Sequence, residues 1–311
     1  MLRRLLLAIS ASHRARDLIT RTPVTREVVQ RFVAGDSAAD VIGVAEHLVS
    51  AGHLVSIDFL GEDTTDPDQA AAVAAEYVAL LELLAATGLT EGGRAEVSVK
   101  PTAVGLGLPE HGEKTAAENI ERICAAARAA GTTVTLDMED QTHVDATLRL
   151  VGEVRADYPD LGCVLQSYLR RTPGDCEALA VSGSRVRLCK GAYRAPDGIA
   201  LAARTEVDRA YARCLRILMH GAGYPMLATH DPRMIAITQS LAGSTHRDPG
   251  SFEYQMLYGV RPDEQRRLTD AGAQVRVYVP YGSDWYGYLV RRLAERPANL
   301  AFFLRALRSR H

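Results

Sequence analysis

Short apolar or β-branched runs alternate along the chain with longer stretches in which apolar residues recur every three to four positions. The first pattern is typical of buried strands and the second of amphipathic helices. The pattern predicts eight strands, at residues 54–59, 96–100, 133–138, 162–168, 186–190, 225–229, 251–257 and 274–279. Between them it predicts helices at residues 66–86, 114–130, 142–158, 174–181, 201–220, 232–242 and 262–271.

Eight strand–helix units predict an α/β fold, a closed (βα)8 barrel of the TIM type. A doubly wound open sheet is the alternative, because alternation alone does not count strands securely. Helical patterns at residues 2–18 and 38–51 precede the first strand, so we expect a helical arm over residues 1–50 and the barrel over residues 51–311. A last helix is expected at residues 283–295.

Charge and cysteine content narrow the class of protein. The 36 Lys and Arg residues nearly balance the 38 Asp and Glu residues, and no long run of one sign occurs. This argues against nucleic acid as a partner, since such binding rests on clustered positive charge. The 5 cysteines include no CxxC pair, which favours reduced thiols in a cytoplasmic protein. The histidines are scattered, so we assign no metal.

Polar and charged residues follow most of the predicted strands. In a (βα)8 barrel the active site lies at the carboxyl ends of the strands, so these residues would converge on one rim. Any one of them has a structural explanation, such as an exposed strand end or a helix cap, but their convergence predicts a site. They are Asp58, Glu62, Lys100, Asp137, Glu139, Gln166, Tyr168, Arg187, Lys190, Tyr193, Thr229, His230, Asp231 and Tyr278.

Two further segments carry candidate chemistry. Arg187 and Lys190 lie on one predicted strand and are followed by Gly191, which suits an anion such as a phosphate. Neither a P-loop nor a GxGxxG motif is present. The last predicted helix places Tyr288, Arg291, Arg292 and Glu295 on neighbouring positions. Adjacent arginines suit a carboxylate, although a solvated helix with an Arg291–Glu295 pair is the plainer alternative.

Eight segments together resemble the flavin-dependent proline dehydrogenases. They occur in order on successive predicted strands and on the last helix, the match extends from about residue 30 to 305, and the length is similar to the monofunctional bacterial form. The segments are VSVK at 97–100, LDME at 136–139, QSY at 166–168, RLCKGAY at 187–193, ATH at 228–230, FEYQMLYG at 252–259, RVYVP at 276–280 and YLVRRLAE at 288–295.

The resemblance implies a distorted barrel that holds FAD noncovalently, with the last helix over the barrel mouth. It implies that L-proline is bound by Lys100, Tyr278, Arg291 and Arg292, and that Asp137 and Arg187 are essential at the flavin and the substrate. The positions that match flavin contacts are Asp137, Gln166, Arg187, Lys190, Gly191, Ala192, Thr229, His230 and Glu295. Glu295 would order the arginine helix, and Glu62 resembles an acid that pairs with the first arginine as a gate.

The implied reaction is oxidation of L-proline to Δ1-pyrroline-5-carboxylate by hydride transfer to flavin N5, with the electrons passed to a membrane quinone. Pyrroline-5-carboxylate dehydrogenase would be the pathway partner. Because hydride departure needs a neutral amine, a cationic site with Lys100 and Arg187 would disfavour the protonated substrate. Residues 2–9 with their arginines suit a peripheral contact at the inner face of the membrane.

Three alternatives stay open at the level of the sequence. One is a hydroxyproline dehydrogenase of the same family, although the hydroxyl of Tyr278 would crowd a 4-substituent. Another is a barrel enzyme with a phosphate-bearing cofactor at Lys190 and Gly191, and the third is a scaffold without activity. The chain also departs from the family at Arg194, where an aromatic residue is frequent, and at Asp231, where many members carry Asn.

Overall fold

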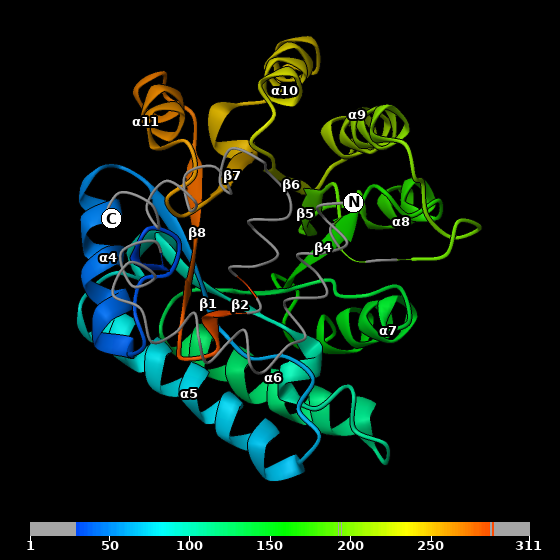
Figure 1. Ribbon diagram of the computed structural model, residues 1–311. Coiled ribbons are helices and arrows are strands. Elements are labelled where there is room, and N and C mark those ends of the chain that lie inside the picture. Colours follow the sequence, from blue (N-terminus) through cyan, green and yellow to red (C-terminus); the bar gives the residue numbers. More distant parts are fainter. Residues whose placement is uncertain (1–28, 192, 194, 287, 289–311) are drawn as a thin grey trace, which may run out of the picture.

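The computed structural model describes residues 29–191, 193, 195–286 and 288, in which eight parallel strands close into a barrel (Figure 1). Each strand pairs with its neighbour in sequence, and β1 also pairs with β8 from Leu54↔Arg276 to Phe59↔Tyr281. The predicted closed barrel is therefore confirmed, and the open sheet is wrong. The strands are β1 (Leu54–Phe59), β2 (Ala95–Val99), β3 (Val134–Leu136), β4 (Gly162–Gln166), β5 (Arg185–Cys189), β6 (Tyr224–Ala228), β7 (Glu253–Leu257) and β8 (Val275–Tyr281).

Helices surround the barrel as an outer ring (Figure 1). One helix follows each strand from β1 to β7, whereas α4 precedes β1, contacts both β1 and β8, and lies in the ring between α11 and α5. The helix before the barrel thus covers the place that the helix after the eighth strand takes in a regular (βα)8 barrel. The helices are α4 (Ala38–Ser50), α5 (Pro67–Ala86), α6 (Gly112–Ala129), α7 (Val144–Val154), α8 (Thr172–Leu179), α9 (Arg204–His220), α10 (Pro232–Ser244) and α11 (Pro262–Asp270), with short 3-10 turns η1 (Glu91–Gly93), η2 (Pro101–Val104) and η3 (Pro249–Ser251).

Of the predicted arm, the structure describes residues 29–50, and its boundary at residue 51 stays a prediction. The face of α4 that carries Val41, Ile42, Ala45 and Leu48 is buried in the main core. Ser37 caps the helix, because its hydroxyl accepts from the backbone N–H of Asp40. The second half of the predicted arm is therefore packed as part of the barrel wall.

Helix α5 has the length and composition of a membrane-crossing segment, and it is the one such helix among the described residues. Asp66 caps it and Pro67 occupies its first turn, as is common at helix starts. Tyr77, Leu80 and Leu81 are fully buried in the main core. These contacts are those of a core helix in a (βα)8 barrel.

The strands point apolar side chains outward and polar side chains inward. Val55, Ile57, Val97 and Val99 belong to the core between the barrel and its helices. Regular barrels fill the interior with branched apolar side chains as well. Here the inward positions of β1, β2, β5, β7 and β8 are mostly polar or charged, namely Ser56, Asp58, Glu96, Ser98, Arg185, Arg187, Glu253, Gln255, Arg276 and Tyr278.

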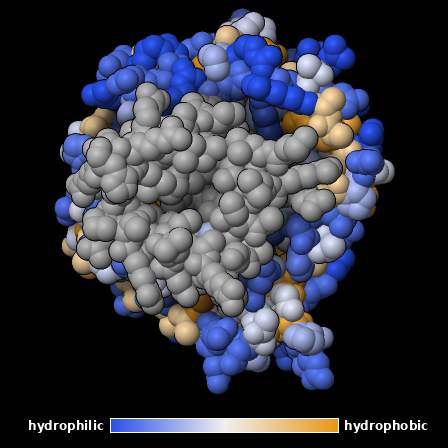
Figure 2. Space-filling model, viewed as in Figure 1, coloured by the Kyte–Doolittle hydropathy of each residue, from blue (hydrophilic) through white to orange (hydrophobic). Residues whose placement is uncertain are grey.

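A second, smaller apolar cluster lies where β1 ends and β7 is followed by its loop. There Phe32 and Val33 pack with Leu60, Val260 and Tyr288. The start of the predicted last helix thus contacts the carboxyl ends of two strands. Figure 2 shows mainly hydrophilic side chains along the rim of this view, outside the part drawn in grey.

Candidate active site

Lys100 and Asp58 form a buried ion pair at the barrel mouth. Lys100 directly follows β2 and Asp58 lies near the end of the neighbouring strand β1, beside Ser98 in the register. The ammonium Nζ of Lys100 lies 2.6 Å from Oδ1 of Asp58, and the two residues are 6% and 0% exposed. Adjacent parallel strands bring these two chain positions together, as the sequence predicts for strand ends.

Asp137 is the centre of the mouth. It follows β3 and accepts hydrogen bonds from Nη1 of Arg187 at 2.7 Å, from the hydroxyl of Tyr278 at 2.7 Å and from the hydroxyl of Ser98 at 2.9 Å. Lys100 Nζ lies 3.8 Å from its Oδ2. The predicted catalytic and substrate residues that the structure describes therefore meet at one carboxylate. We name this group the mouth cluster: Asp58, Lys100, Asp137, Arg187 and Tyr278.

The ring of Tyr278 also packs on Arg187, with the guanidinium carbon 5.3 Å from the ring centroid. Burial and the carboxylates of Asp137 and Asp58 raise the pKa of Tyr278 well above its ordinary value. The phenol is therefore a neutral donor to Asp137 at all ordinary pH values.

Burial also shapes the charge of the mouth pair. It would lower the pKa of Lys100, but Asp58, Asp137 and Glu62 raise that pKa above its ordinary value. Burial raises the pKa of Asp58 to about 6 in spite of Lys100. At neutral pH the two cations Lys100 and Arg187 face the two anions Asp58 and Asp137, so the mouth cluster has no net positive charge. The expected cationic site would need other groups, such as Arg291 and Arg292, which lie outside the described residues.

A second charged layer lies below the mouth, toward the amino ends of the strands. Glu96 lies 2.5 Å from Arg185, 3.6 Å from Arg187 and 3.8 Å from Arg276, and Glu253 lies 2.8 Å from Arg276. Burial alone would raise the pKa of Glu96, but the guanidiniums hold it below its ordinary value. We name Glu96, Arg185, Glu253 and Arg276 the floor cluster. The floor cluster was not predicted from the sequence, although polar residues at every second strand position are a signal for it.

Glu139 and Gln166 link the ends of β3 and β4. The side chain of Gln166 donates to the backbone carbonyl of Glu139 at 2.7 Å. The carboxylate of Glu139 accepts from the hydroxyl and the backbone N–H of Thr102 at 2.6 and 2.9 Å. Burial raises the pKa of Glu139 to about 7. Gln166, which is 2% exposed, therefore holds the loop after β3 in place through the Glu139 carbonyl.

Lys190 is held by two carboxylates, Asp208 of α9 at 2.5 Å and Asp231 at 2.9 Å. Arg233 pairs with the same two carboxylates. The predicted anion site at Lys190 is thus already charge-balanced. Asp231 also caps α10, since it accepts from the backbone N–H of Arg233, which gives this departure from the family a structural role.

Gly191, Thr229 and His230 are each fixed by local contacts. A Cβ at Gly191, whose φ is +97°, would lie 2.1 Å from the ring of Tyr168, so only glycine fits. The hydroxyl of Thr229 accepts from the backbone N–H of Asp231, and Nε2 of His230 accepts from the backbone N–H of Leu257. The predicted residues that lie outside the described part of the chain are Ala192, Arg194, Arg291, Arg292 and Glu295.

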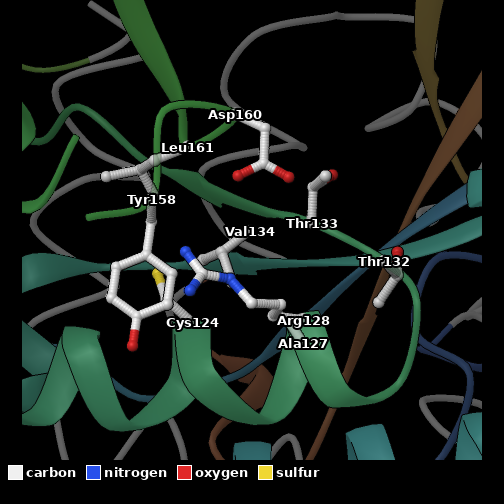
Figure 3. Close-up of a pocket in the computed structure, with 9 residues that line it drawn as sticks. All are labelled: Cys124, Ala127, Arg128, Thr132, Thr133, Val134, Tyr158, Asp160 and Leu161. Carbon is white, nitrogen blue, oxygen red and sulfur yellow. The ribbon is translucent and has the colours of Figure 1, made fainter. Parts of the chain in front are cut away.

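A small surface pocket lies at the opposite, amino end of β3 and β4 (Figure 3). Its lining includes Cys124 and Arg128, whose guanidinium carbon lies 4.2 Å from the ring centroid of Tyr158. Burial raises the pKa of Cys124 to about 12, so its thiol is not a nucleophile at neutral pH. Within the described residues, no group of three His, Cys, Asp or Glu side chains could hold a metal ion.

Comparison with known proteins decides the family. The family model described as proline dehydrogenase matches residues 41–305. Proline dehydrogenase 1 of Bacillus subtilis is 36% identical over 284 residues, which cover 91% of each chain. The chain belongs to the proline dehydrogenase family. Another member, proline dehydrogenase of Deinococcus radiodurans, is 38% identical over 90% of each chain.

More distant relatives of this proline dehydrogenase chain are parts of larger proteins. The bifunctional protein PutA of Escherichia coli is 27% identical over 88% of this chain and 24% of its own length. The crystal structure of proline utilization A from Bdellovibrio bacteriovorus matches with a TM-score of 0.78 at 24% identity, and the chain spans 32% of it. That likeness supports the same barrel fold. The roles of single residues in this proline dehydrogenase stay predictions.

Proposed function

We propose that this proline dehydrogenase oxidises L-proline to Δ1-pyrroline-5-carboxylate with bound FAD and passes the electrons to a membrane quinone. The observation that supports this most is the mouth cluster, in which Lys100, Arg187 and Tyr278 meet at Asp137 within a barrel of the family. The reaction removes a hydride from the ring carbon that is next to nitrogen and does not carry the carboxylate, and a proton from the amine.

The residues at the mouth fit a flavin. Nε of Arg187 is buried and has no hydrogen-bond partner among the described residues, so the chain leaves a donor for an acceptor atom of a ligand. The ring of Tyr168 lies against Gly191, and its buried hydroxyl likewise has no hydrogen-bond partner among the described residues. When bound, FAD would supply the two-electron acceptor, and Gln166, Lys190, Gly191, Ala192, Thr229 and His230 would line its site together with Asp137, Arg187 and Glu295.

The protein's own work in this mechanism is to hold and orient. Lys100 would bind the substrate together with Arg291 and Arg292, of which the two arginines would pair with its carboxylate, and Tyr278 would pack against the ring. Asp137 fixes Tyr278 and Arg187 through its two oxygens, at 2.7 Å each. Glu62 would close the site as the gate. Lys100 and Arg187 are each paired with a carboxylate of the protein. Their positions would therefore be fixed before the charged substrate binds.

We further propose a cytoplasmic enzyme that touches the inner face of the membrane through residues 2–9, where a quinone is accessible. These residues lie outside the described part of the chain. The product would be consumed by pyrroline-5-carboxylate dehydrogenase.

The test is the visible spectrum of the purified protein, followed by addition of L-proline without oxygen. We expect a flavin band that bleaches with L-proline, and no bleaching in the double variant Arg291→Ala with Arg292→Ala. Hydroxyproline in a parallel sample separates the two substrates, and a quinone added afterwards should restore the band. A colourless protein that takes up no added FAD would overturn the proposal.

A further inference from the structure

The loop that carries Glu62 is attached to the next loop of the barrel at Thr102 and, by a longer bond of 3.4 Å from the Thr64 hydroxyl, at the carbonyl of Ala103. The backbone N–H of Asp63 donates to the Thr102 hydroxyl at 3.1 Å. The hydroxyl of Thr64 donates to the Thr102 carbonyl at 2.8 Å, and the backbone N–H of Thr64 donates to the same oxygen at 3.3 Å. Both residues directly after Glu62 are therefore bound to the turn that follows Lys100.

Thr102 is in turn fixed by Glu139. The Thr102 hydroxyl donates its proton to Oε1 of Glu139 at 2.6 Å, which leaves the oxygen lone pairs to accept from Asp63. The backbone N–H of Thr102 donates to Oε2 at 2.9 Å. Thr102 and Glu139 are 1% and 4% exposed, so these bonds form away from water, where the loss of one partner is costly.

The same chain of bonds continues to β4, because Gln166 donates to the Glu139 carbonyl. The loops after β1, β2 and β3 are thus joined at one place. The charge of Glu62 also affects two neighbouring residues, since it raises the pKa of both Lys100 and Glu139. The joint lies between two residues with proposed roles at the substrate, the gate Glu62 and the substrate-binding residue Lys100.

We infer that Thr102 and Glu139 form a latch that positions the Glu62 loop beside Lys100, and that the two residues act as positioning residues for substrate binding. The inference rests on the proposed function, in which Glu62 closes the site over L-proline. Neither residue is placed at the reacting atoms. The latch therefore acts on the capture of substrate more than on its oxidation.

The first test replaces the Thr102 hydroxyl by a methyl group of the same size. In Thr102→Val we expect the KM for L-proline to rise about tenfold, equivalent to about 1.4 kcal/mol, with kcat within about twofold of wild type. Thr102→Ser keeps the hydroxyl and should restore KM. The matched control is Thr147→Val on α7, where the buried hydroxyl has no hydrogen-bond partner among the described residues.

The second test asks whether the latch acts through Glu62. In a Glu62→Ala background, Thr102→Val should add little to KM, because the group that the latch positions is already gone. Full additivity of the two effects, or an unchanged KM in Thr102→Val, would overturn the inference. If Thr102→Val does not fold, Glu139→Gln serves as the second variant in the same cycle, since it keeps the size of the side chain but not its two acceptor oxygens.

Hydrogen exchange provides a readout that does not need turnover. The amides of Asp63 and Thr64 should exchange faster in Thr102→Val than in wild type and in Thr147→Val. If wild type shows this protection but does not oxidise L-proline, the proposed function fails while the latch stands. If wild type oxidises L-proline and the two amides exchange alike in all variants, the latch is wrong.

Discussion

The floor cluster and the mouth cluster place the same kinds of group in the same barrel, yet their carboxyls behave in opposite ways. Glu96 on the floor is surrounded by Arg185, Arg187 and Arg276, and its pKa lies below the ordinary value. Asp58 at the mouth has the single cation Lys100 and a second carboxylate, Asp137, nearby, and its pKa is raised to about 6. Both are fully buried, so burial alone does not explain the difference.

The ratio of cations to anions around each carboxyl explains it. Three guanidiniums outweigh the desolvation of one carboxylate, whereas one ammonium shared between two carboxylates does not. The floor cluster therefore keeps its charges across the range in which enzymes work, and it supports the fold. Asp58 of the mouth cluster, with a pKa of about 6, changes its charge within that range, and perturbed groups of this kind are common at functional sites.

The largest effect should come from breaking the floor cluster. In Glu96→Gln, the buried guanidiniums of Arg187 and Arg276 and the partly buried one of Arg185 lose a shared counter-charge, and loss of one partner of a buried pair costs about 3–5 kcal/mol. We expect a free energy of unfolding lower by about that amount, measured by urea unfolding of the purified protein.

The matched control is Glu113→Gln, which removes the exposed pair between Glu113 and Arg149 with the same chemical change. Its stability should stay close to wild type. Equal stability of all three proteins would contradict the structural role of the floor cluster.

The next effect concerns activity. Asp137→Asn keeps the size of the side chain but removes the charge that Arg187 and Tyr278 share. Loss of a charged partner that orients an active site costs about 2.7 kcal/mol or more, so kcat/KM should fall by roughly a hundredfold or more. Steady-state kinetics with L-proline measure this, and unfolding should change less than in Glu96→Gln. If Asp137→Asn loses stability but keeps the wild-type kcat/KM, the mouth cluster supports the fold as the floor cluster does, and the proposed difference between the two clusters is wrong.

The smallest effect is the pH dependence of the mouth. Folding raises the pKa of Asp58 from 3.8 to about 6, so the folded protein binds this proton more tightly than the unfolded chain. The stability that this group contributes is present in full below about pH 4 and is lost as pH rises through about 6. Protonation below pH 6 also removes the charge that holds Lys100. We therefore expect kcat/KM to fall below pH 6.

Asp58→Asn should remove this acid limb from the pH profile of kcat/KM. Glu139, with a pKa of about 7, titrates in both proteins and cancels in the comparison. An identical acid limb in wild type and Asp58→Asn would show that another group governs it.

The sequence predicted the strands closely but not the direction of each side chain. The third strand was predicted over residues 133–138 but covers Val134–Leu136, and after it the side chains of Asp137 and Glu139 bind residues of the site. The fifth was predicted from residue 186, yet Arg185 belongs to it and points to Glu96. Apolar periodicity locates a strand. The sequence does not show, however, to which side of the barrel wall the side chain of a charged residue at the start of that strand points.

The candidate site was predictable where a polar residue ends an apolar strand, as at Lys100 and Asp137. A contact of the site was not predictable from the sequence if the partner residue lies on a helix or on a distant strand. Asp208 of α9 binds Lys190, and Ser56 of β1 binds Arg187 at 3.1 Å across the barrel. The first of these pairs joins the end of β5 to the helix that follows it, whereas the second depends on closure of the barrel, which brings residues 131 positions apart into contact.

Closure by β1 and β8 also sets the order of events during synthesis. Leu54 pairs with Arg276, 222 residues later, so the first strand has no second neighbour until almost the whole barrel has been made. At about 5–20 residues per second the ribosome needs roughly 10–45 s for that stretch. Throughout this time one edge of β1 and the part of α4 that contacts β8 have no partner, so the growing chain exposes an unpaired strand edge of the kind that favours aggregation.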